Sequence, residues 1–577
     1  MNSLLLAALM MVGYFVAYHT YGKFLARKIF KLNPEAAVPS TALQDDHDFV
    51  PTKKHILFGH HFTSIAGLGP IGGPAIAIIW GWLPAVLWVF LGSIFFGAIH
   101  DFGALVVSMR SQGRSIGDLA SDIVNKRVRS LFLLIIFFLL WIVIAIFGLI
   151  VAILFTMYPV AVIPVWFEIV IALYLGHMIY KQGKNEWWPS IVAVTIMYLT
   201  VIIGAYVPVD FQAIFGMSAK STLITWIVIV LALSAWLASS LPVQTLLQPR
   251  DFINSHQLLI ALALLTLGVI VAHPPIVAPV VNMAPKGAPP VWPFLFVVIA
   301  CGAISGFHSL VSSGTSSKQC KTEGDSLYIG FGSMLLEGTL AALVIVAVAA
   351  GIGLGYTAKG GEIFTGAAAW QHHYADWGSI GGVGNYLRAV IQGSANMIQA
   401  IGIPAKITLA IMAVFVVSFA ATTLDSATRI QRYVVVELSN AWNFKPLTGR
   451  QAATAFAVLS AALLAFYDGS GKGALKLWPL FGSLNQLLAG LALLVITIYL
   501  ARRKINIAFT CIPMIFMIIM TTWAMIINIG RYYSSANWLL FVISLVVFLL
   551  EIWMIIESVL VLKTVFAKEE GLPETVT

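Results

Sequence analysis

The stretch from His60 to Pro74 reads HHFTSIAGLGPIGGP. Its last eight residues hold four glycines and two prolines. Such a run is hard to keep helical, because glycine loosens a helix and proline removes a donor and clashes one turn back. Apolar residues continue on both sides, so the run falls inside a predicted membrane span at 60–82. Non-helical backbone at that depth is tolerated where it is buried in protein or lines a cavity.

Interrupted helices are the usual substrate and ion sites of secondary transporters, because their free N–H and C=O groups can hold ligands. The double proline and the flanking histidine pair favour this interpretation. Close helix packing through small residues is the alternative. The sequence therefore predicts a substrate site at the break, formed by Gly67, Gly69, Pro70, Gly72 and Gly73.

The whole chain has the composition of a membrane protein. Of its 577 residues, 60% are hydrophobic and 10% are charged, whereas about 25% are charged in average globular proteins. We predict an all-α polytopic membrane protein, because a spanning helix needs about 20 apolar residues and the chain has many such blocks. About 15 transmembrane helices are expected, at 2–21, 60–82, 84–109, 131–156, 161–180, 188–207, 222–246, 256–273, 292–316, 326–352, 406–426, 451–467, 478–500, 507–529 and 536–562.

The formal charge of +9 is interpreted as basic cytoplasmic loops and not as nucleic-acid binding. Most of the 33 Lys and Arg residues fall in alternate connecting segments, which predicts an outside N-terminus and a cytoplasmic C-terminus. Neither long connection, 22–59 or 353–405, is large enough for an ordinary catalytic domain. The second has room for a re-entrant or amphipathic segment. The three cysteines lie far apart, without disulfide or metal spacing.

Several ionisable residues fall inside the predicted spans: His100, Asp101, His308, Glu337 and Asp425. Such groups are expensive in hydrocarbon and usually face a pathway or a partner. A satisfied core histidine is the alternative for His308. For Asp425, the alternative is an i, i+4 pair with Arg429. Glu168 is placed near a span end, where its side chain can reach the interface.

Hydroxyl side chains are concentrated after His308, with six Ser or Thr residues in the next nine positions. Together with backbone carbonyls they make a hard oxygen site suited to Na⁺, for which Ser312, Ser313 and Thr315 are the candidates. The same hydroxyls can equally cap a helix end.

Five stretches together resemble the carbon starvation protein A (CstA) family. They are FGHHFTSIAGLGPIGGP (58–74), LPVQTLLQPRD (241–251), ACGAISGFH (300–308), ATTLD (421–425) and WPLFGSLNQ (478–486). These stretches are long, ordered and spread over most of the chain. Members of the family are bacterial or archaeal inner-membrane proteins linked to uptake of peptides, and in some cases of pyruvate with protons, when carbon is scarce.

The resemblance implies a five-plus-five inverted-repeat transporter core with broken helices, similar to the amino acid–polyamine–organocation transporters. It divides the chain into an N-terminal extra helix and cytoplasmic loop (1–59), the transporter core (60–430) and C-terminal transmembrane helices (431–577). Counted from His60, the eighth core helix is 292–316. The break of the sixth core helix then lies near Ser239 and Ser240, which become candidate substrate-binding residues.

We therefore predict a secondary active transporter, not an enzyme, that imports small peptides or pyruvate-like carboxylates across the inner membrane during carbon starvation. The sequence contains no P-loop or other nucleotide motif, which argues against ATP-driven pumping. The expected partners are the small-molecule substrate and membrane lipid, with no nucleic acid. No cofactor is expected, and the sequence indicates no oligomeric state.

Two coupling ions are open. A proton carrier needs a titratable group, and histidine is the natural one. The candidates are His60, His61, His100, Asp101, His308 and Asp425. Buried His and Asp groups are scarcer than hydroxyls in membrane spans, so proton coupling is favoured, with His61, Asp101 and His308 as the relay. Sodium coupling is the alternative. So is an intramembrane metal-dependent protein built on the His/Asp cluster, because imidazole and carboxylate suit zinc or iron, although no metalloprotease motif supports it.

Overall fold

The computed structural model describes residues 2–124 and 126–568. It is helical throughout apart from one short β-hairpin, which confirms the all-α polytopic fold. In the described residues, 12 helices are long and apolar enough to cross a membrane, or up to 13 with one bent pair. The two other predicted spans are present in altered form, because 451–467 is a 17-residue helix and 292–316 is split in two.

The α-helices in the first half of the chain are α1 (Ser3–Ala17), α2 (Pro39–Ala42), α3 (Lys54–Ile65), α4 (Gly69–Ala77), α5 (Trp82–Gly92), α6 (Ala98–Met109), α7 (Ile116–Ile123), α8 (Lys126–Met157), α9 (Val162–Gly176), α10 (Trp187–Tyr206), α11 (Phe211–Phe215), α12 (Ala219–Ile229), α13 (Leu237–Ser240) and α14 (Leu247–Ala272). Those in the second half are α15 (Val291–Val298), α16 (Gly306–Gly314), α17 (Ser333–Ala349), α18 (Gly366–His373), α19 (Trp377–Ile380), α20 (Val383–Gln399), α21 (Ala405–Ala441), α22 (Arg450–Phe466), α23 (Trp478–Arg502), α24 (Ala508–Ser534) and α25 (Trp538–Lys568). The hairpin pairs β1 (Tyr356–Thr357) with β2 (Ile363–Phe364).

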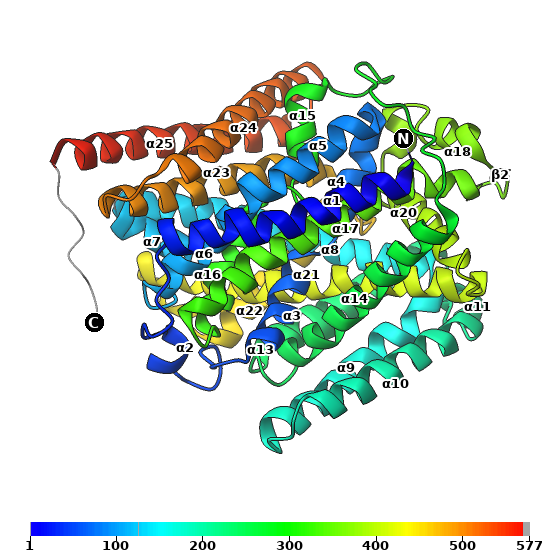
Figure 1. The fold of residues 1–577 in the computed structure, drawn as a ribbon, viewed down its shortest axis with the longest axis horizontal. Coiled ribbons are helices and arrows are strands. Elements are labelled where there is room, and N and C mark those ends of the chain that lie inside the picture. Colours follow the sequence, from blue (N-terminus) through cyan, green and yellow to red (C-terminus); the bar gives the residue numbers. More distant parts are fainter. Residues whose placement is uncertain (1, 125, 569–577) are drawn as a thin grey trace.

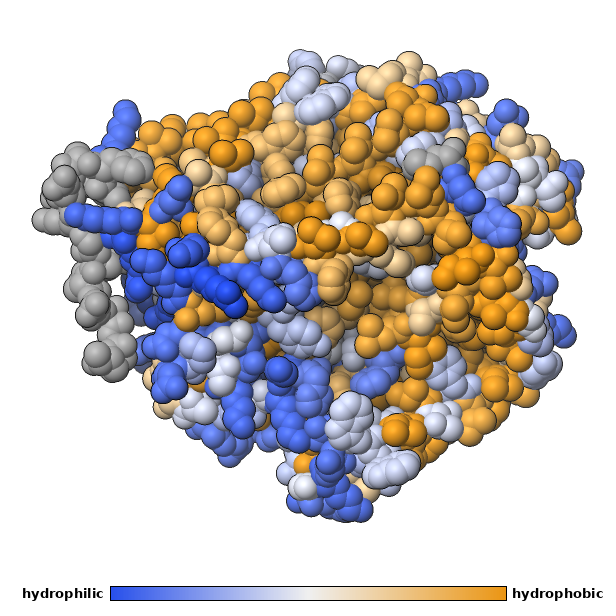
Figure 2. Space-filling view, viewed as in Figure 1, coloured by the Kyte–Doolittle hydropathy of each residue, from blue (hydrophilic) through white to orange (hydrophobic). Residues whose placement is uncertain are grey.

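The long helices run side by side along the horizontal axis of the view (Figure 1). In Figure 2, apolar residues cover the middle of the visible face and hydrophilic residues gather at its left end and along its right edge. This band is what a protein surrounded by lipid needs, since the bilayer core offers no hydrogen bonds to polar groups. The α9–α10 hairpin lies at one margin of the bundle, and α24 and α25 lie at the opposite margin (Figure 1).

The predicted break in the span at 60–82 is present. The helices α3 and α4 meet at an angle of 43°, and Ala66, Gly67 and Leu68 separate them. The break is shorter than the predicted run, because Pro70 occupies the first turn of α4, where its missing N–H costs nothing. Gly69 and the residues as far as Ala77 are helical.

A second break interrupts the segment that was predicted as one span at 292–316. The helix α15 ends at Val298 and α16 begins at Gly306, and Gly302 between them has a φ of +88°. The break predicted near Ser239 and Ser240 is the end of a helix and not an interruption within a span. Helix α13 simply ends at Ser240, and the chain then turns before α14.

The packing around the two broken spans is reciprocal. The span that follows the first broken span ends in α6, which packs on α16. The helix that follows the second broken span, α17, packs on α4. The next long helices of each set, α8 and α21, pack on each other. Each broken span is thus packed against a helix that follows the other broken span. The predicted domain limits at residues 59 and 430 stay predictions.

The connection at 353–405 contains a helix of its own, α20, which has a buried face and packs on α4, α14, α17 and α21. The hairpin, α18 and α19 lie beside it at the same end of the bundle (Figure 1). The helix α20 is thus an amphipathic segment within the connection at 353–405, where such a segment was predicted to fit.

Candidate functional site

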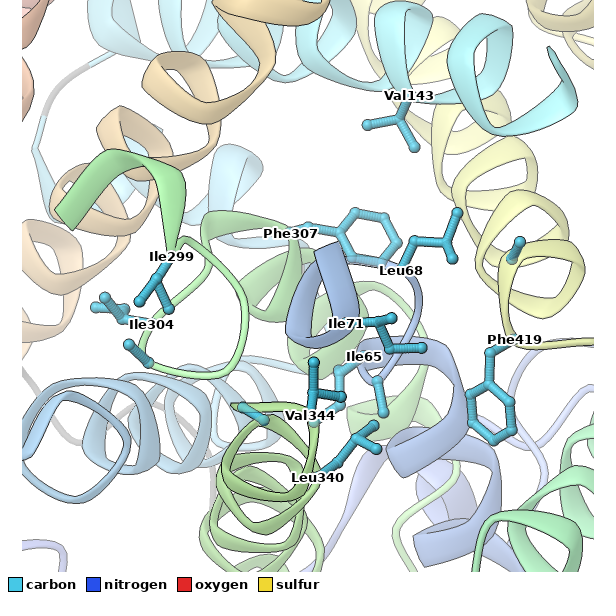
Figure 3. Packing of buried hydrophobic residues seen from close by; sticks show 14 of the residues in the cluster. Ile65, Leu68, Ile71, Val143, Ile299, Ile304, Phe307, Leu340, Val344 and Phe419 are labelled. Carbon is cyan, nitrogen blue, oxygen red and sulfur yellow. The ribbon is translucent and has the colours of Figure 1, made fainter. Parts of the chain in front are cut away.

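The two broken spans lie against each other, and the labelled Leu68, Ile299 and Ile304 mark their breaks in Figure 3. A Cβ atom built on Gly69 would lie 2.3 Å from the side chain of Cys301, and one on Gly73 would lie 2.6 Å from the carbonyl oxygen of Val298. Only glycine allows backbones to approach this closely. The glycines at the start of α4 are therefore needed for contact with the second broken span.

A cavity of about 530 Å³ opens beside the two breaks. Gly69, Gly72 and Gly73, three of the candidate substrate residues, line it together with Ala300 and Cys301. Aromatic rings form much of the remaining wall: Phe147, Phe294, Trp377, Trp478, Phe481 and Tyr532. The polar lining comes from α24 and the residues after it: Asn528, Arg531, Ser535 and Asn537.

The other predicted substrate residues lie away from this cavity. Gly67 packs against the side chain of Thr423, and Pro70 is buried below Gly302. The hydroxyl of Ser239 is buried and has no hydrogen-bond partner among the described residues, and Ser240 contacts Gln451 on α22. Neither serine lines the cavity, because α13 ends in a different part of the bundle from the two breaks.

Asp101 is the centre of a buried cluster that joins α6, α16 and α17. Its Oδ1 lies 2.7 Å from Nδ1 of His100, and its Oδ2 lies 2.9 Å from Nδ1 of His308. On the far side of the His308 ring, Nε2 lies 3.4 Å from Oε2 of Glu337. The other Glu337 oxygen accepts the N–H of Gly302 at 2.9 Å. His100, Asp101, His308 and Glu337, which are far apart in sequence, thus belong to one group.

His60 and His61 do not join that cluster by hydrogen bonds and instead face the hydroxyl run. Nδ1 of His60 lies 2.5 Å from Oδ2 of Asp251 on α14, and its Nε2 lies 3.1 Å from Oγ1 of Thr315. Nδ1 of His61 lies 2.7 Å from Oγ of Ser316. The histidines and the hydroxyls, which the sequence assigned to rival coupling ions, are therefore neighbours.

The other two hydroxyl candidates have different surroundings. Ser313 donates to the carbonyl of Ser309 and accepts the N–H of Ile116, so it holds α16 and α7 together. Ser312 is fully buried and its hydroxyl has no hydrogen-bond partner among the described residues.

Asp425 pairs with Arg250, not with Arg429. The guanidinium of Arg250 bonds to Asp425 Oδ2 and, at 2.7 Å, to Glu168 Oε1. All three side chains are at most 1% exposed, so Glu168 does not reach the interface as predicted. Ser234 donates to Asp425 at 2.7 Å. This triad links α9, α14 and α21.

Arg429 binds elsewhere, to Asp48 at 3.1 Å and to the carbonyls of Ala238 and Leu241. Burial disfavours the ionised carboxylate of Asp48, but Arg429 and Arg432 outweigh burial and hold the pKa of this carboxyl well below its usual range. The connection before α3 is thereby fastened to α21.

Sequence reasoning missed Asp251 and Arg250 as site residues, although both lie in the quoted stretch at 241–251. The span was predicted to begin at residue 256, whereas α14 begins at Leu247. Cys301 was also missed, because its neighbours in space are distant in sequence. The available signal was its position beside the glycine that makes the second break.

Comparison with known sequences gives the family. A sequence model described as "Carbon starvation protein CstA" matches residues 2–524. The chain belongs to the CstA family. It is 32% identical to the peptide transporter CstA of Campylobacter jejuni, over 90% of this chain and 79% of that relative. It is 31% identical to the peptide transporter CstA of Bacillus subtilis, over 95% of each.

Another relative carries a different name. The chain is 30% identical to the pyruvate/proton symporter BtsT of Escherichia coli, over 89% of this chain and 80% of that protein. Among solved structures, the crystal structure of MhsT in complex with L-phenylalanine aligns with a TM-score of 0.49 and 12% identity, over 87% of this chain and 99% of that one. The CstA chain is thus a multi-pass membrane protein of a transporter family.

Proposed function

We propose that this CstA protein is a proton-coupled secondary transporter that imports small peptides across the bacterial inner membrane when carbon is scarce. One observation carries the proposal. The same two broken spans form the wall of the central cavity at Gly69 and Cys301, and hold a buried histidine–hydroxyl site at His60 and Thr315. A movement of one broken span against the other therefore changes both sites together, which is what coupling requires.

The size and lining of the cavity favour a peptide over pyruvate. Pockets that enclose drug-sized ligands measure about 300–1,000 Å³, and 530 Å³ falls within this range. Pyruvate, with six non-hydrogen atoms, would leave most of that volume to water at about 30 Å³ per molecule. The aromatic wall accommodates apolar side chains of a peptide, and Arg531 supplies a partner for its carboxylate. Pyruvate is the second candidate, because a relative bears its name.

The proton site is assigned to His60 and Asp251. Both are fully buried, and the second carboxylate oxygen of Asp251 has no hydrogen-bond partner in the described structure. When His60 is protonated, the pair is a neutral ion pair, and loss of that proton leaves a buried negative charge. Such a charge is costly at this depth. The free energy of burying the His60–Asp251 pair therefore depends on whether His60 carries its proton.

Sodium is the second candidate ion, and a specific group of oxygen atoms favours it. At the first break, Oγ1 of Thr423 lies 3.4 Å from the carbonyl oxygen of Ser64, and the hydroxyls of Ser64 and Ser426 lie 2.9 Å apart. These oxygens come from α3 and α21. Hard oxygen ligands without a titratable group suit a cation that is not a proton.

The expected orientation follows the distribution of basic residues, with the end that carries α2 in the cytoplasm and the end that carries α18 outside. Residues 569–577 at the C-terminus lie outside the described residues. A tag placed there should be reachable only from the cytoplasm, and one before Ser3 only from outside.

Counterflow in proteoliposomes tests the substrate and the ion together. Labelled dipeptide and labelled pyruvate would be offered separately, under an imposed pH gradient in sodium-free buffer and under an imposed Na⁺ gradient at equal pH. We expect dipeptide accumulation driven by the pH gradient alone. Accumulation of pyruvate without dipeptide would refute the peptide assignment. Strict dependence on Na⁺ would refute the proton and favour the oxygens around Ser64.

Asp251→Asn should separate coupling from binding. The variant keeps the shape of the side chain but loses the charge that stabilises protonated His60. We expect loss of accumulation under a pH gradient, while exchange of labelled for unlabelled substrate continues. The matched control is His256→Gln on the same helix, whose ring bonds only to the carbonyl of Phe252 in the described structure. Unchanged accumulation in Asp251→Asn would show that the proton binds elsewhere.

A further inference from the structure

Three potential metal ligands meet beside the cavity: Cys301 from the second break, His308 from α16 and Glu337 from α17. All three residues are buried. One ligand atom from each, a sulfur, a nitrogen and an oxygen, lies within 4.8 Å of the others. Cys301 also lines the central cavity.

The distance between His308 and Glu337 fits a shared metal ion better than a hydrogen bond. Nε2 of His308 and Oε2 of Glu337 are 3.4 Å apart, and neither atom has a hydrogen-bond partner within the described residues. Hydrogen bonds from nitrogen to oxygen cluster near 2.9–3.0 Å. Two ligands held at about 2.0–2.2 Å by one tetrahedral zinc ion stand roughly 3.3–3.6 Å apart.

Neighbouring groups already hold these two ligands in orientation. Asp101 binds Nδ1 of His308 at 2.9 Å, which leaves Nε2 as the free ring nitrogen. The N–H of Gly302 binds Oε1 of Glu337 at 2.9 Å, which leaves Oε2 free. Metal-binding histidines regularly donate their other nitrogen to a carboxylate in this way. The arrangement thus turns both free atoms toward each other.

The carboxylates of the cluster have only histidines as ion-pair partners among the described residues. Glu337 and Asp101 are fully buried, and their ion-pair partners in the described structure are the histidines His100 and His308. No Lys or Arg of the described residues pairs with either carboxylate. A buried carboxyl group is usually paired with a cation, bound to a metal or neutral. A divalent ion bound by His308 and Glu337 would be a permanent positive charge beside both carboxyl groups.

We propose that Cys301, His308 and Glu337 bind one divalent transition-metal ion of the Zn²⁺ class beside the central cavity. A set of one sulfur, one imidazole nitrogen and one carboxylate oxygen suits such an ion and not Mg²⁺ or Ca²⁺, which prefer oxygen alone. Three protein ligands leave one coordination position for water or a substrate group. The ion would also fasten the second break to α17.

Metal content and cobalt spectroscopy of the purified, full-length protein test this site without any transport assay. The protein would be purified on a tag without histidines, stripped with a chelator and loaded with Zn²⁺ or Co²⁺. We expect one ion per chain, and a sulfur-to-cobalt charge-transfer band in the Co²⁺ form. Less than a tenth of an ion per chain after loading, or a Co²⁺ form without that band, would overturn the proposal.

Matched variants assign the ion to these residues. Cys301→Ser should abolish the charge-transfer band, whereas Cys320→Ser, at the other buried cysteine, should retain it. Glu337→Gln should lower the affinity for Zn²⁺ at least tenfold, and Asp101→Asn should lower it about 10–100-fold by releasing the His308 ring. Thermal unfolding would verify that each variant is folded. A normal band in folded Cys301→Ser would place the metal elsewhere, whatever the outcome for peptide uptake.

Discussion

Gly73→Leu is expected to reduce dipeptide uptake to the level of empty liposomes. The new Cβ would lie 2.6 Å from the carbonyl oxygen of Val298 and 3.2 Å from Cα of Ile299. Both contacts are with backbone, so neither can be relieved by rotation of a side chain. The two breaks would have to separate, and the rest of the leucine would enter the cavity that Gly73 lines. Uptake and size-exclusion profiles would be measured on the same preparation.

The control for this substitution is Gly530→Leu. Gly530 lies in the membrane helix α24, and a Cβ built on it meets nothing within 4 Å. We expect normal uptake from this variant, so general effects of adding leucine to a helix are accounted for. Normal uptake by Gly73→Leu would show that the contact between the breaks is not required for transport. Gly69→Leu, which would collide with Cys301, provides an independent repeat of the test.

The sequence predicted the first break because its cause is local. Glycine and proline act on the backbone of their own turn, so their clustering between Gly67 and Pro74 was visible without knowledge of any partner. The second break has no proline, and its one marked residue is Gly302 with a positive φ. Hydropathy alone shows a continuous apolar segment there. Isolated glycines occur inside many intact membrane helices.

The site residues also divide into features that are local in the sequence, which could be predicted, and pairings between helices, which could not. The sequence identified His60, Asp101 and His308 because ionisable groups are rare in lipid. It could not pair them, because helical periodicity reports which residues share one face of one helix and not which faces meet. Asp425 shows the consequence. Its nearest cation by helix spacing is Arg429, but Arg250, on another helix 175 residues earlier, is the partner.

Arg250→Met is expected to be among the most destabilising single substitutions in the protein. The change preserves most of the apolar stem but leaves Glu168 and Asp425 as buried, uncompensated carboxylates. Removal of one partner from a buried ion pair costs about 3–5 kcal/mol. The loss would be measured as a fall in the midpoint of thermal unfolding in detergent. Arg27→Met is the control, because Arg27 is exposed and loss of its charge should change the midpoint of thermal unfolding little.

A triple variant distinguishes the cost of stranded charges from the value of the interaction itself. Glu168→Gln and Asp425→Asn, added to Arg250→Met, remove both carboxylates and keep side chains that can still bond to Asn254, Ser418 and Ser234. Neutral replacements of whole buried ion networks are often tolerated, so we expect most of the lost stability to return.

If the triple variant is as unstable as Arg250→Met, the guanidinium holds α9, α14 and α21 together through its own contacts. If Arg250→Met unfolds at the same temperature as Arg27→Met, the carboxylates are not charged in the folded protein. If the triple variant recovers its stability but not its uptake, the charges of Glu168, Arg250 and Asp425 are needed for transport and not for folding.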